Sequence, residues 1–249
     1  MELKRNVFLV TGAASGLGAA VAHAFAAAGA LVFGVDLRAP EVLPAGCAGF
    51  MQADVCDPEQ LAAALAGATA LGPLRGAVHC AGIAPAARVL GRDGPHDLAL
   101  FRKVIEVNLI GSFNLVRLAG DAIARTDPLA DGERGVLVLT ASVAAFDGQI
   151  GQAAYAASKA AVAGMTLPIA RELARFGIRV VTIAPGTMQT PMMAGMSQEV
   201  QDALGAAVPY PPRLGRPDEF AALARHIVEN VYLNGETIRL DGAIRLAPK

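Results

Sequence analysis

The sequence predicts an α/β fold built on a parallel sheet, and three observations support this. Apolar runs of strand length alternate along the chain with longer stretches that have helical spacing. The apolar runs are continuous rather than alternating, which is typical of strands covered on both faces. A glycine-rich turn, "TGAASGLG", joins the first run to the first helical stretch. Together these features indicate repeated strand–helix–strand units.

The expected elements follow one another in regular order. Seven segments read as strands: 6–12, 31–36, 49–55, 75–82, 134–142, 178–186 and 235–243. The stretches between them that read as helices are 17–30, a segment opened by Asp57 as N-cap and Pro58 in the first turn, 96–126, 152–175 and a segment from Pro217. Right-handed crossovers between such units predict a doubly wound Rossmann fold, with a seven-stranded parallel sheet flanked by helices.

The organisation of the chain indicates a single domain over residues 1–249. The sequence contains no Ser/Gly linker, repeat or low-complexity tract, and its length suits one large α/β domain. The least regular region is 185–217, which is rich in proline and methionine. This region is either an irregular connection or a mobile apolar lid beside a ligand. We favour the lid because the region follows the end of a strand, where such folds bind ligands.

Composition excludes several classes of partner. The chain is 54% hydrophobic, but its apolar runs are shorter than the ~20 residues that a membrane span needs. The first apolar run is too short for a signal peptide, so we expect a cytoplasmic protein. A net charge of −1 without a basic stripe argues against nucleic acid. Cys47, Cys56 and Cys80 form no metal-type cluster, and we interpret them as buried apolar residues.

The glycine turn predicts a dinucleotide site. Glycines at 12, 16 and 18 allow a sharp turn and a close approach of the backbone to a pyrophosphate. The helix that follows offers free N–H groups and the positive end of its dipole. The position of the turn between a strand and a helix is the context that such a site requires.

The cofactor is expected to be NAD. Asp36 ends the second strand, where a carboxylate accepts hydrogen bonds from ribose hydroxyls and repels a 2′-phosphate. No basic residue replaces Ser15 in the glycine turn, and Leu37 follows Asp36. Arg38 lies close to this position, so NADP stays open as an alternative.

At this point the sequence resembles a known family. The residues that carry the resemblance to the short-chain dehydrogenase/reductase superfamily are Gly12, Gly16, Gly18, "CAG" (80–82), Asn108, Ser142, Tyr155, Lys159 and "PGTMQTP" (185–191). Segments beyond these motifs, including "VPYPPRLGRPDEF" and "YLNGETIRLDGAIRL", look like the type II 3-hydroxyacyl-CoA dehydrogenase subfamily, also called hydroxysteroid dehydrogenases. The match runs from about residue 6 to the C-terminus.

The resemblance implies roles for four catalytic residues. Tyr155 would be the general base in alcohol oxidation and the acid in ketone reduction. Lys159 would lower the pKa of the tyrosine and bind the nicotinamide ribose. Ser142 would hold the substrate oxygen, and Asn108 would position a water molecule behind the lysine.

Physical reasoning supports the tyrosine–lysine pair independently. Tyr155 and Lys159 are four residues apart, so they share one face of a helix. A free tyrosine titrates near pH ~10, and a nearby ammonium favours its phenolate form. Taken alone, each residue has a plain alternative: a surface pair on a helix, a turn serine after a strand, or an asparagine at a helix bend. Their combination with the glycine turn favours the catalytic interpretation.

The resemblance also implies the cofactor contacts. These are Gly12, Ser15, Gly16, Leu17, Gly18, Asp36, Leu37, Asp54, Val55, Cys80, Ala81, Gly82, Tyr155, Lys159, Pro185, Gly186, Thr187 and Thr190. The chain departs from the family where His79 replaces an asparagine that supports the sheet by hydrogen bonding. We expect His79 to be a core histidine with satisfied hydrogen bonds that does the same job.

Candidate substrate contacts are Ser142, Gln149, Gln152, Tyr155, Met188 and Met192, with Met193 beside them. Arg88 and Arg92 are weak candidates for the phosphates of CoA and are better interpreted as solvated charges. The resemblance implies a homotetramer and a small-molecule substrate, with no metal. The expected reaction is NAD-dependent oxidation of (S)-3-hydroxyacyl-CoA to 3-ketoacyl-CoA.

Three alternatives stay open at this stage. Two belong to the same class: a reductase for ketoacyl carriers, and a secondary-alcohol or hydroxysteroid dehydrogenase. The third is a dinucleotide-binding regulator without catalysis, which we expect to lack Tyr155 or Lys159, and both residues are present.

Overall fold

The strands form one seven-stranded parallel sheet in a computed structural model that describes residues 1–92, 94–195 and 197–248, without the side chains of 192 and 194. The sheet has the order β3-β2-β1-β4-β7-β8-β9, and every neighbouring pair is parallel. Its strands are β1 (Val7–Thr11), β2 (Leu31–Asp36), β3 (Cys47–Gln52), β4 (Leu74–His79), β7 (Gly135–Thr140), β8 (Ile178–Pro185) and β9 (Thr237–Leu240). The predicted doubly wound sheet is confirmed.

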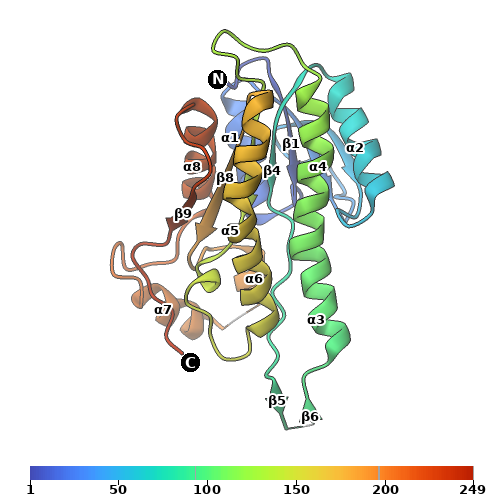
Figure 1. The fold of residues 1–249 in the computed structure, drawn as a ribbon. Coiled ribbons are helices and arrows are strands. Elements are labelled where there is room, and N and C mark those ends of the chain that lie inside the picture. The colour runs from blue at the N-terminus through green and yellow to red at the C-terminus, as the bar shows by residue number, and fades with distance from the viewer. Residues whose placement is uncertain (93, 196, 249) are drawn as a thin grey trace.

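Helices cover both faces of the sheet (Figure 1). One face carries α1 (Gly16–Ala27) and α8 (Pro217–Glu229). The other carries α2 (Pro58–Ala70), α4 (Gly111–Ala124) and α5 (Ala153–Leu173). Asp57 caps α2, as predicted, by accepting hydrogen bonds from the Glu59 and Gln60 N–H groups at 2.9 and 3.1 Å.

The two layers explain why the strands are apolar throughout. Along β1, Phe8 packs into the core beneath α1 and α8, whereas Leu9 packs into the core beneath α2, α4 and α5. Both side chains are fully buried, which stabilises the fold by about 1.5–3 kcal/mol for each. Phe8 also meets Phe25 of α1 edge to face, with ring centroids 5.2 Å apart.

The long helix expected over 96–126 is divided into three parts. It consists of α3 (Leu98–Ile105), a π-helical turn (Glu106–Ile110) and α4. The π turn contains Asn108, which the sequence had marked as a misfit inside a helix. Such turns are rare and frequently lie at functional sites.

Region 185–217 is more regular than an irregular connection, because it contains α6 (Pro191–Ala194) and α7 (Gln198–Ala206). Two further short strands, β5 (Leu90–Gly91) and β6 (Gly94–Pro95), pair antiparallel and project beyond the end of α3 (Figure 1). Within the described residues, no helix is both long enough and apolar enough to cross a membrane.

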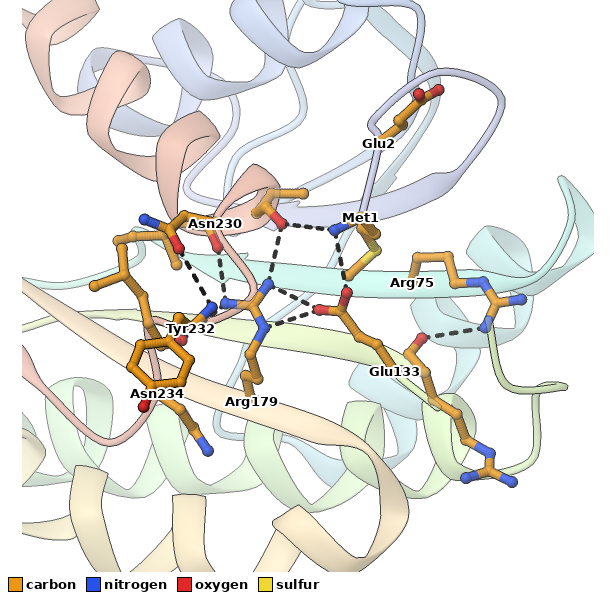
Figure 2. A network of polar contacts seen from close by, with 12 residues as sticks. Met1, Glu2, Arg75, Glu133, Arg179, Asn230, Tyr232 and Asn234 are labelled. Carbon is orange, nitrogen blue, oxygen red and sulfur yellow. Dashed lines mark hydrogen bonds and ion pairs between the residues drawn. The ribbon is translucent and has the colours of Figure 1, made fainter. Parts of the chain in front are cut away.

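A buried charge pair lies at the amino-terminal edge of the sheet (Figure 2). Arg179, near the start of β8, is 2.8 Å from the carboxylate of Glu133, which precedes β7. The remaining donors of Arg179 bind the carbonyls of Ile227, Val228 and Leu233. The guanidinium therefore satisfies the last carbonyls of α8 and fixes this helix to the sheet.

Candidate active site

The glycine turn after β1 lies against the loop that follows β4. Gly12 has a φ of +66°, and a Cβ at this position would lie 3.0 Å from the Ala81 nitrogen. A Cβ on Gly18 would overlap the Gly12 carbonyl oxygen. The turn and the first turn of α1 thus pack backbone against backbone, which only glycine permits at these two positions.

Asp36 places its carboxylate beside the same turn. Its two oxygens accept hydrogen bonds from the N–H groups of Ala14 and Arg38, at 3.1 and 3.2 Å. Leu37 beside it is exposed. The position at the end of β2 is the one from which an acid can meet the ribose of a dinucleotide.

Asp54 and Val55 lie between β3 and α2, where they were predicted to line an adenine pocket. Asp54 accepts a hydrogen bond from the Cys56 N–H at 2.9 Å. Val55 packs against Gly111, and its carbonyl accepts from the Asn114 side chain at 2.8 Å. The structure therefore fastens this segment to the start of α4.

The segment after β8 comes back to the glycine turn. A Cβ on Gly16 would lie 3.6 Å from the methyl group of Thr190, which precedes α6. Gly186 passes close to the backbone of Asp241 after β9, where a Cβ would lie 2.9 Å from the Cα of that aspartate. The hydroxyl of Thr187 is buried, and no described residue supplies it with a hydrogen-bond partner.

Lys159 is buried on α5 at the carboxyl-terminal ends of the strands, with an exposed fraction of 4%. Its ammonium donates to the Thr140 carbonyl at 2.7 Å and lies 5.8 Å from the centre of the Tyr155 ring. Burial lowers the pKa of Lys159 to about 8, although Cys80 opposes the shift. Among the described ion pairs, none joins Lys159 to a carboxylate.

Tyr155 and Ser142 meet at the same edge. Burial raises the pKa of Tyr155, and a hydrogen bond from Ser142 works in the opposite direction. The Ser142 oxygen also accepts from the Ala144 N–H at 3.1 Å, because Ser142 caps a 3₁₀ turn (Val143–Ala145). The serine is thereby fixed next to the tyrosine hydroxyl.

Asn108 fastens the loop after β4 to α5. Its carboxamide exchanges two hydrogen bonds of 2.9 Å with the backbone of Ile83 and donates to the Ser158 hydroxyl at 3.0 Å. The side chain is fully buried in the π turn. Both N–H groups of the Asn108 side chain therefore bind other residues of the protein. The water molecule that Asn108 is expected to position stays a prediction.

Only one of the two ring nitrogens of His79, at the end of β4, has a hydrogen-bond partner among the described residues. Its Nδ1 lies 2.9 Å from the hydroxyl of Thr11, which also receives the N–H groups of Cys80 and Ala81 at 3.2 Å. With both lone pairs of that oxygen engaged, its proton points to Nδ1, so the histidine carries its own proton on Nε2.

This Nε2 is fully buried and has no partner among the described residues, which corrects the expectation of a fully satisfied histidine. Burial, assisted by the charge of Lys159, lowers the pKa of His79 to about 3. The histidine is therefore neutral and adds no second charge beside the lysine.

The predicted substrate contacts fall into different environments. Gln149 and Gln152 lie on the loop before α5 and bind each other. Met188 is buried in the core against Gly215, and its substrate contact stays a prediction. The side chain of Met192 lies outside the described residues.

The two arginines expected to be solvated, Arg88 and Arg92, are both exposed on the segment around β5. Arg88 also lines a cavity of about 480 Å³ that reaches Gln149 and Gln152. A substrate contact for Arg88 stays a prediction.

Sequence reasoning missed Thr140. Its carbonyl accepts the hydrogen bond from Lys159, and its hydroxyl donates to the His79 carbonyl at 2.6 Å. A polar residue at the end of an apolar strand was the available signal, but its partners come from distant segments.

Comparison with known proteins fits this geometry. A family model described as short chain dehydrogenase matches residues 6–201. The chain belongs to the short-chain dehydrogenase family. It is therefore an oxidoreductase that uses a nicotinamide dinucleotide, as its glycine turn and buried lysine indicate.

Relatives of this short-chain dehydrogenase match over almost their full length. It is 48% identical to a Drosophila melanogaster protein named 3-hydroxyacyl-CoA dehydrogenase type-2, over 99% of this chain and 100% of the relative. A Homo sapiens protein of the same name is 46% identical, over 99% and 98%. A crystal structure of a Mycobacterium avium protein of that name has a TM-score of 0.93 at 44% identity, covering 98% of this chain and 97% of the other.

Proposed function

We propose that this chain oxidises (S)-3-hydroxyacyl-CoA to 3-ketoacyl-CoA with NAD, in a reversible reaction. Relatives named 3-hydroxyacyl-CoA dehydrogenase type-2, similar along the whole chain, support the substrate class. The observation that carries the chemistry is the buried Lys159, which lies beside Tyr155 and pairs with no carboxylate among the described residues. A fold rarely keeps such a charge unless its function needs it.

The residues present fit a dinucleotide. The backbone contact of Gly12 and Gly18 leaves no side chain between the turn and a pyrophosphate. The Asp36 carboxylate would meet the adenosine ribose, which favours NAD over NADP. The hydroxyl of Thr187, which is buried and has no partner among the described residues, suits the carboxamide of a nicotinamide.

The remaining residues proposed to contact the cofactor surround this turn or lie at strand ends. Besides those already placed they are Ser15, Gly16, Leu17, Leu37, Asp54, Val55, Cys80, Ala81, Gly82, Tyr155, Lys159, Pro185, Gly186 and Thr190. When bound, the nicotinamide accepts a hydride from the carbon that bears the alcohol.

The protein supplies the proton chemistry. Ser142 would hold the substrate oxygen, and Tyr155 would remove the hydroxyl proton as hydride leaves the carbon. The hydrogen bond from Ser142 opposes the effect of burial on the pKa of Tyr155, and the Lys159 ammonium, 5.8 Å from the centre of the ring, would favour the phenolate as well. Because the pKa of Lys159 is about 8, the ammonium is present at neutral pH and is lost as pH rises through that value.

A substrate panel tests this function. Purified protein should oxidise NADH with acetoacetyl-CoA, with a clear preference over NADPH, when absorbance of the reduced cofactor is followed. Turnover of a steroid or simple secondary alcohol, without turnover of the thioester, would instead indicate a secondary-alcohol or hydroxysteroid dehydrogenase. A preference for a carrier-bound ketoacyl group with NADPH would indicate the reductase. Cofactor binding without turnover of any of these substrates would indicate a dinucleotide-binding regulator without catalysis.

We also propose that residues 185–217, with α6 and α7, act as a lid and that the protein is a homotetramer. Exposed apolar side chains on the outer helices, Ile110, Phe113 and Leu167, support an interface between copies. Light scattering should give the mass of four chains, and the mass of one chain would reject the tetramer.

A further inference from the structure

The segment that follows β9 folds back over the loop before α5. The Gln149 side chain donates to the Ala247 carbonyl at 3.0 Å, and the Ile150 N–H donates to the Pro248 carbonyl at 3.1 Å. Arg239 of β9 forms an ion pair of 2.6 Å with Asp147 of the loop. Two contacts thus tie residues 149–150 to residues 247–248, and a third ties Asp147 to β9.

These contacts fix the orientation of two glutamine side chains. A backbone carbonyl only accepts hydrogen bonds, so the atom of Gln149 that faces Ala247 must be its nitrogen. The oxygen of Gln149 then faces Gln152, and the atom of Gln152 that meets it, at 3.4 Å, must also be nitrogen. The oxygen of Gln152 is left on the other side.

That oxygen, Oε1 of Gln152, is buried and has no donor among the described residues. Leaving a buried acceptor unpaired costs about 1–3 kcal/mol, so its position needs a reason. Gln152 immediately precedes α5, three residues before Tyr155. It also lines the cavity of about 480 Å³ between segments 87–90 and 148–153. The acceptor therefore belongs to a residue that lines this cavity and begins the helix that carries Tyr155.

We propose that Oε1 of Gln152 accepts a hydrogen bond from the first amide N–H of the thioester arm of the substrate. The proposal rests on the function proposed above. The substrate hydroxyl is already assigned to Ser142 and Tyr155, and the acyl chain offers no donor. The next donor along an acyl-CoA is the amide N–H, two methylene groups beyond the sulfur. Gln152 is thus a specificity-determining residue, while Gln149 and the segment 241–248 position it.

The arrangement predicts discrimination against thioesters that lack this amide. The oxygen of Gln152 is shielded from solvent, so a bound donor gains a contact without displacing a protein partner. The last side-chain torsion of Gln152 is soft, so we infer that ligand binding can turn the oxygen toward the cavity that Gln152 lines. A site with a buried acceptor rejects ligands without a donor more strongly than an apolar pocket rejects a missing methylene.

The test compares two acetoacetyl thioesters: the N-acetylcysteamine ester, which has the amide, and the S-butyl ester, which lacks it. For the natural sequence we expect kcat/KM to favour the amide ester by about 10- to 100-fold, corresponding to the cost of one unpaired group. In Gln152→Met, which keeps the length but has no acceptor, this ratio should fall to near one. Gln149→Leu should lower it partially, through a rise in KM for the amide ester.

Glu172→Met, at the exposed far end of α5, is the matched control and should keep both the ratio and the activity. If the natural sequence shows a kcat/KM ratio near one for the two esters, the inference about Gln152 is wrong and no variant is needed. Turnover of both esters would in that case still support the proposed function. Failure to turn over either ester or acetoacetyl-CoA would overturn both. Melting temperature and NADH binding of Gln152→Met show that the variant is folded, and an unchanged ratio in that folded variant rejects the role of Gln152.

Discussion

The amino-terminal and carboxyl-terminal edges of the sheet differ in whether their buried polar atoms have hydrogen-bond partners within the protein. At the amino-terminal edge, Arg179 uses all three of its nitrogens on Glu133 and on carbonyls at the end of α8 and just beyond it (Figure 2). At the carboxyl-terminal edge, polar atoms of His79, Thr187 and Gln152 are buried and have no hydrogen-bond partner in the part of the chain that the structure describes. Arg75 Nε is a similar orphan at the amino-terminal edge, although its neighbouring nitrogen makes three hydrogen bonds.

This difference separates polar groups that stabilise the fold from those that serve a ligand. A buried polar group that the protein satisfies itself contributes to stability, as the Arg179–Glu133 pair does. A group left unsatisfied weakens the ligand-free fold and gains a partner only when a ligand binds. Lys159 is related to the second kind: it has a hydrogen bond to the Thr140 carbonyl, but burial disfavours its charge. Substitutions at the two edges should therefore have separable effects on stability and on turnover.

The largest effect is expected at the carboxyl-terminal edge. Tyr155→Phe removes the proposed acid/base group and should lower kcat by roughly 10²- to 10⁴-fold, while the melting temperature and NADH binding change little. Tyr232→Phe, at a tyrosine that is 97% exposed, is the matched control and should have no effect. Full activity in folded Tyr155→Phe would reject the catalytic role.

The amino-terminal edge should give the reverse result. Arg179→Met leaves Glu133 with the Met1 ammonium and removes the donor to three backbone carbonyls, so it should lower the free energy of unfolding by about 2–4 kcal/mol, measured by urea denaturation. The kcat of the folded fraction should be unchanged, because the pair is remote from Tyr155. Arg125→Met breaks an exposed pair with Asp121 and should cost less than about 1 kcal/mol. Equal costs for the two variants would contradict the comparison.

Lys159→Met should abolish activity and yet stabilise the ligand-free protein. The pKa of Lys159 is about 8 in the fold and 10.5 in its ordinary state, so the unfolded chain binds more protons between these values. The free energy of unfolding of the natural sequence therefore rises between pH 8 and pH 10.5. Below pH 8 the fold carries the full cost of burying the charged ammonium. The variant should be more stable at pH 7 by about 1–3 kcal/mol, since it carries no buried charge.

This advantage of Lys159→Met should shrink as pH approaches 10.5, which denaturation curves at several pH values would show. Burial raises the pKa of Cys80 to about 12 although the charge of Lys159 lowers it, so the variant should also lose this interaction at high pH. A variant that is less stable at every pH would show that the lysine stabilises the ligand-free fold.

The smallest effect concerns Asp36. Asp36→Ser removes the carboxylate that would repel a 2′-phosphate and should shift the ratio of kcat/KM for NADPH over NADH upward by about tenfold. The melting temperature should change little, because Asp36 accepts only two long hydrogen bonds from backbone N–H groups. Asp121→Ser, at an exposed site on α4, is the control. An unchanged ratio would show that Asp36 does not select the cofactor.

Several elements were predictable because their signals are local. The continuous apolar runs predicted the buried strands, and Asp57 with Pro58 predicted the start of α2. The π turn at Asn108 was not predictable, because it depends on hydrogen bonds to Ile83 and Ser158 from other segments. The helices α6 and α7 were missed because proline and methionine dominate the local pattern.

The sequence by itself determined the parallel sheet, the glycine turn and the shared helix face of Tyr155 and Lys159, since each depends on residues close together in the chain. Only the tertiary structure decided which polar groups are satisfied. The Nε2 proton of His79 depends on Thr11, and the free oxygen of Gln152 depends on the carbonyl of Ala247 through Gln149. Hydrogen bonds between distant segments set these orientations, and no local pattern encodes them.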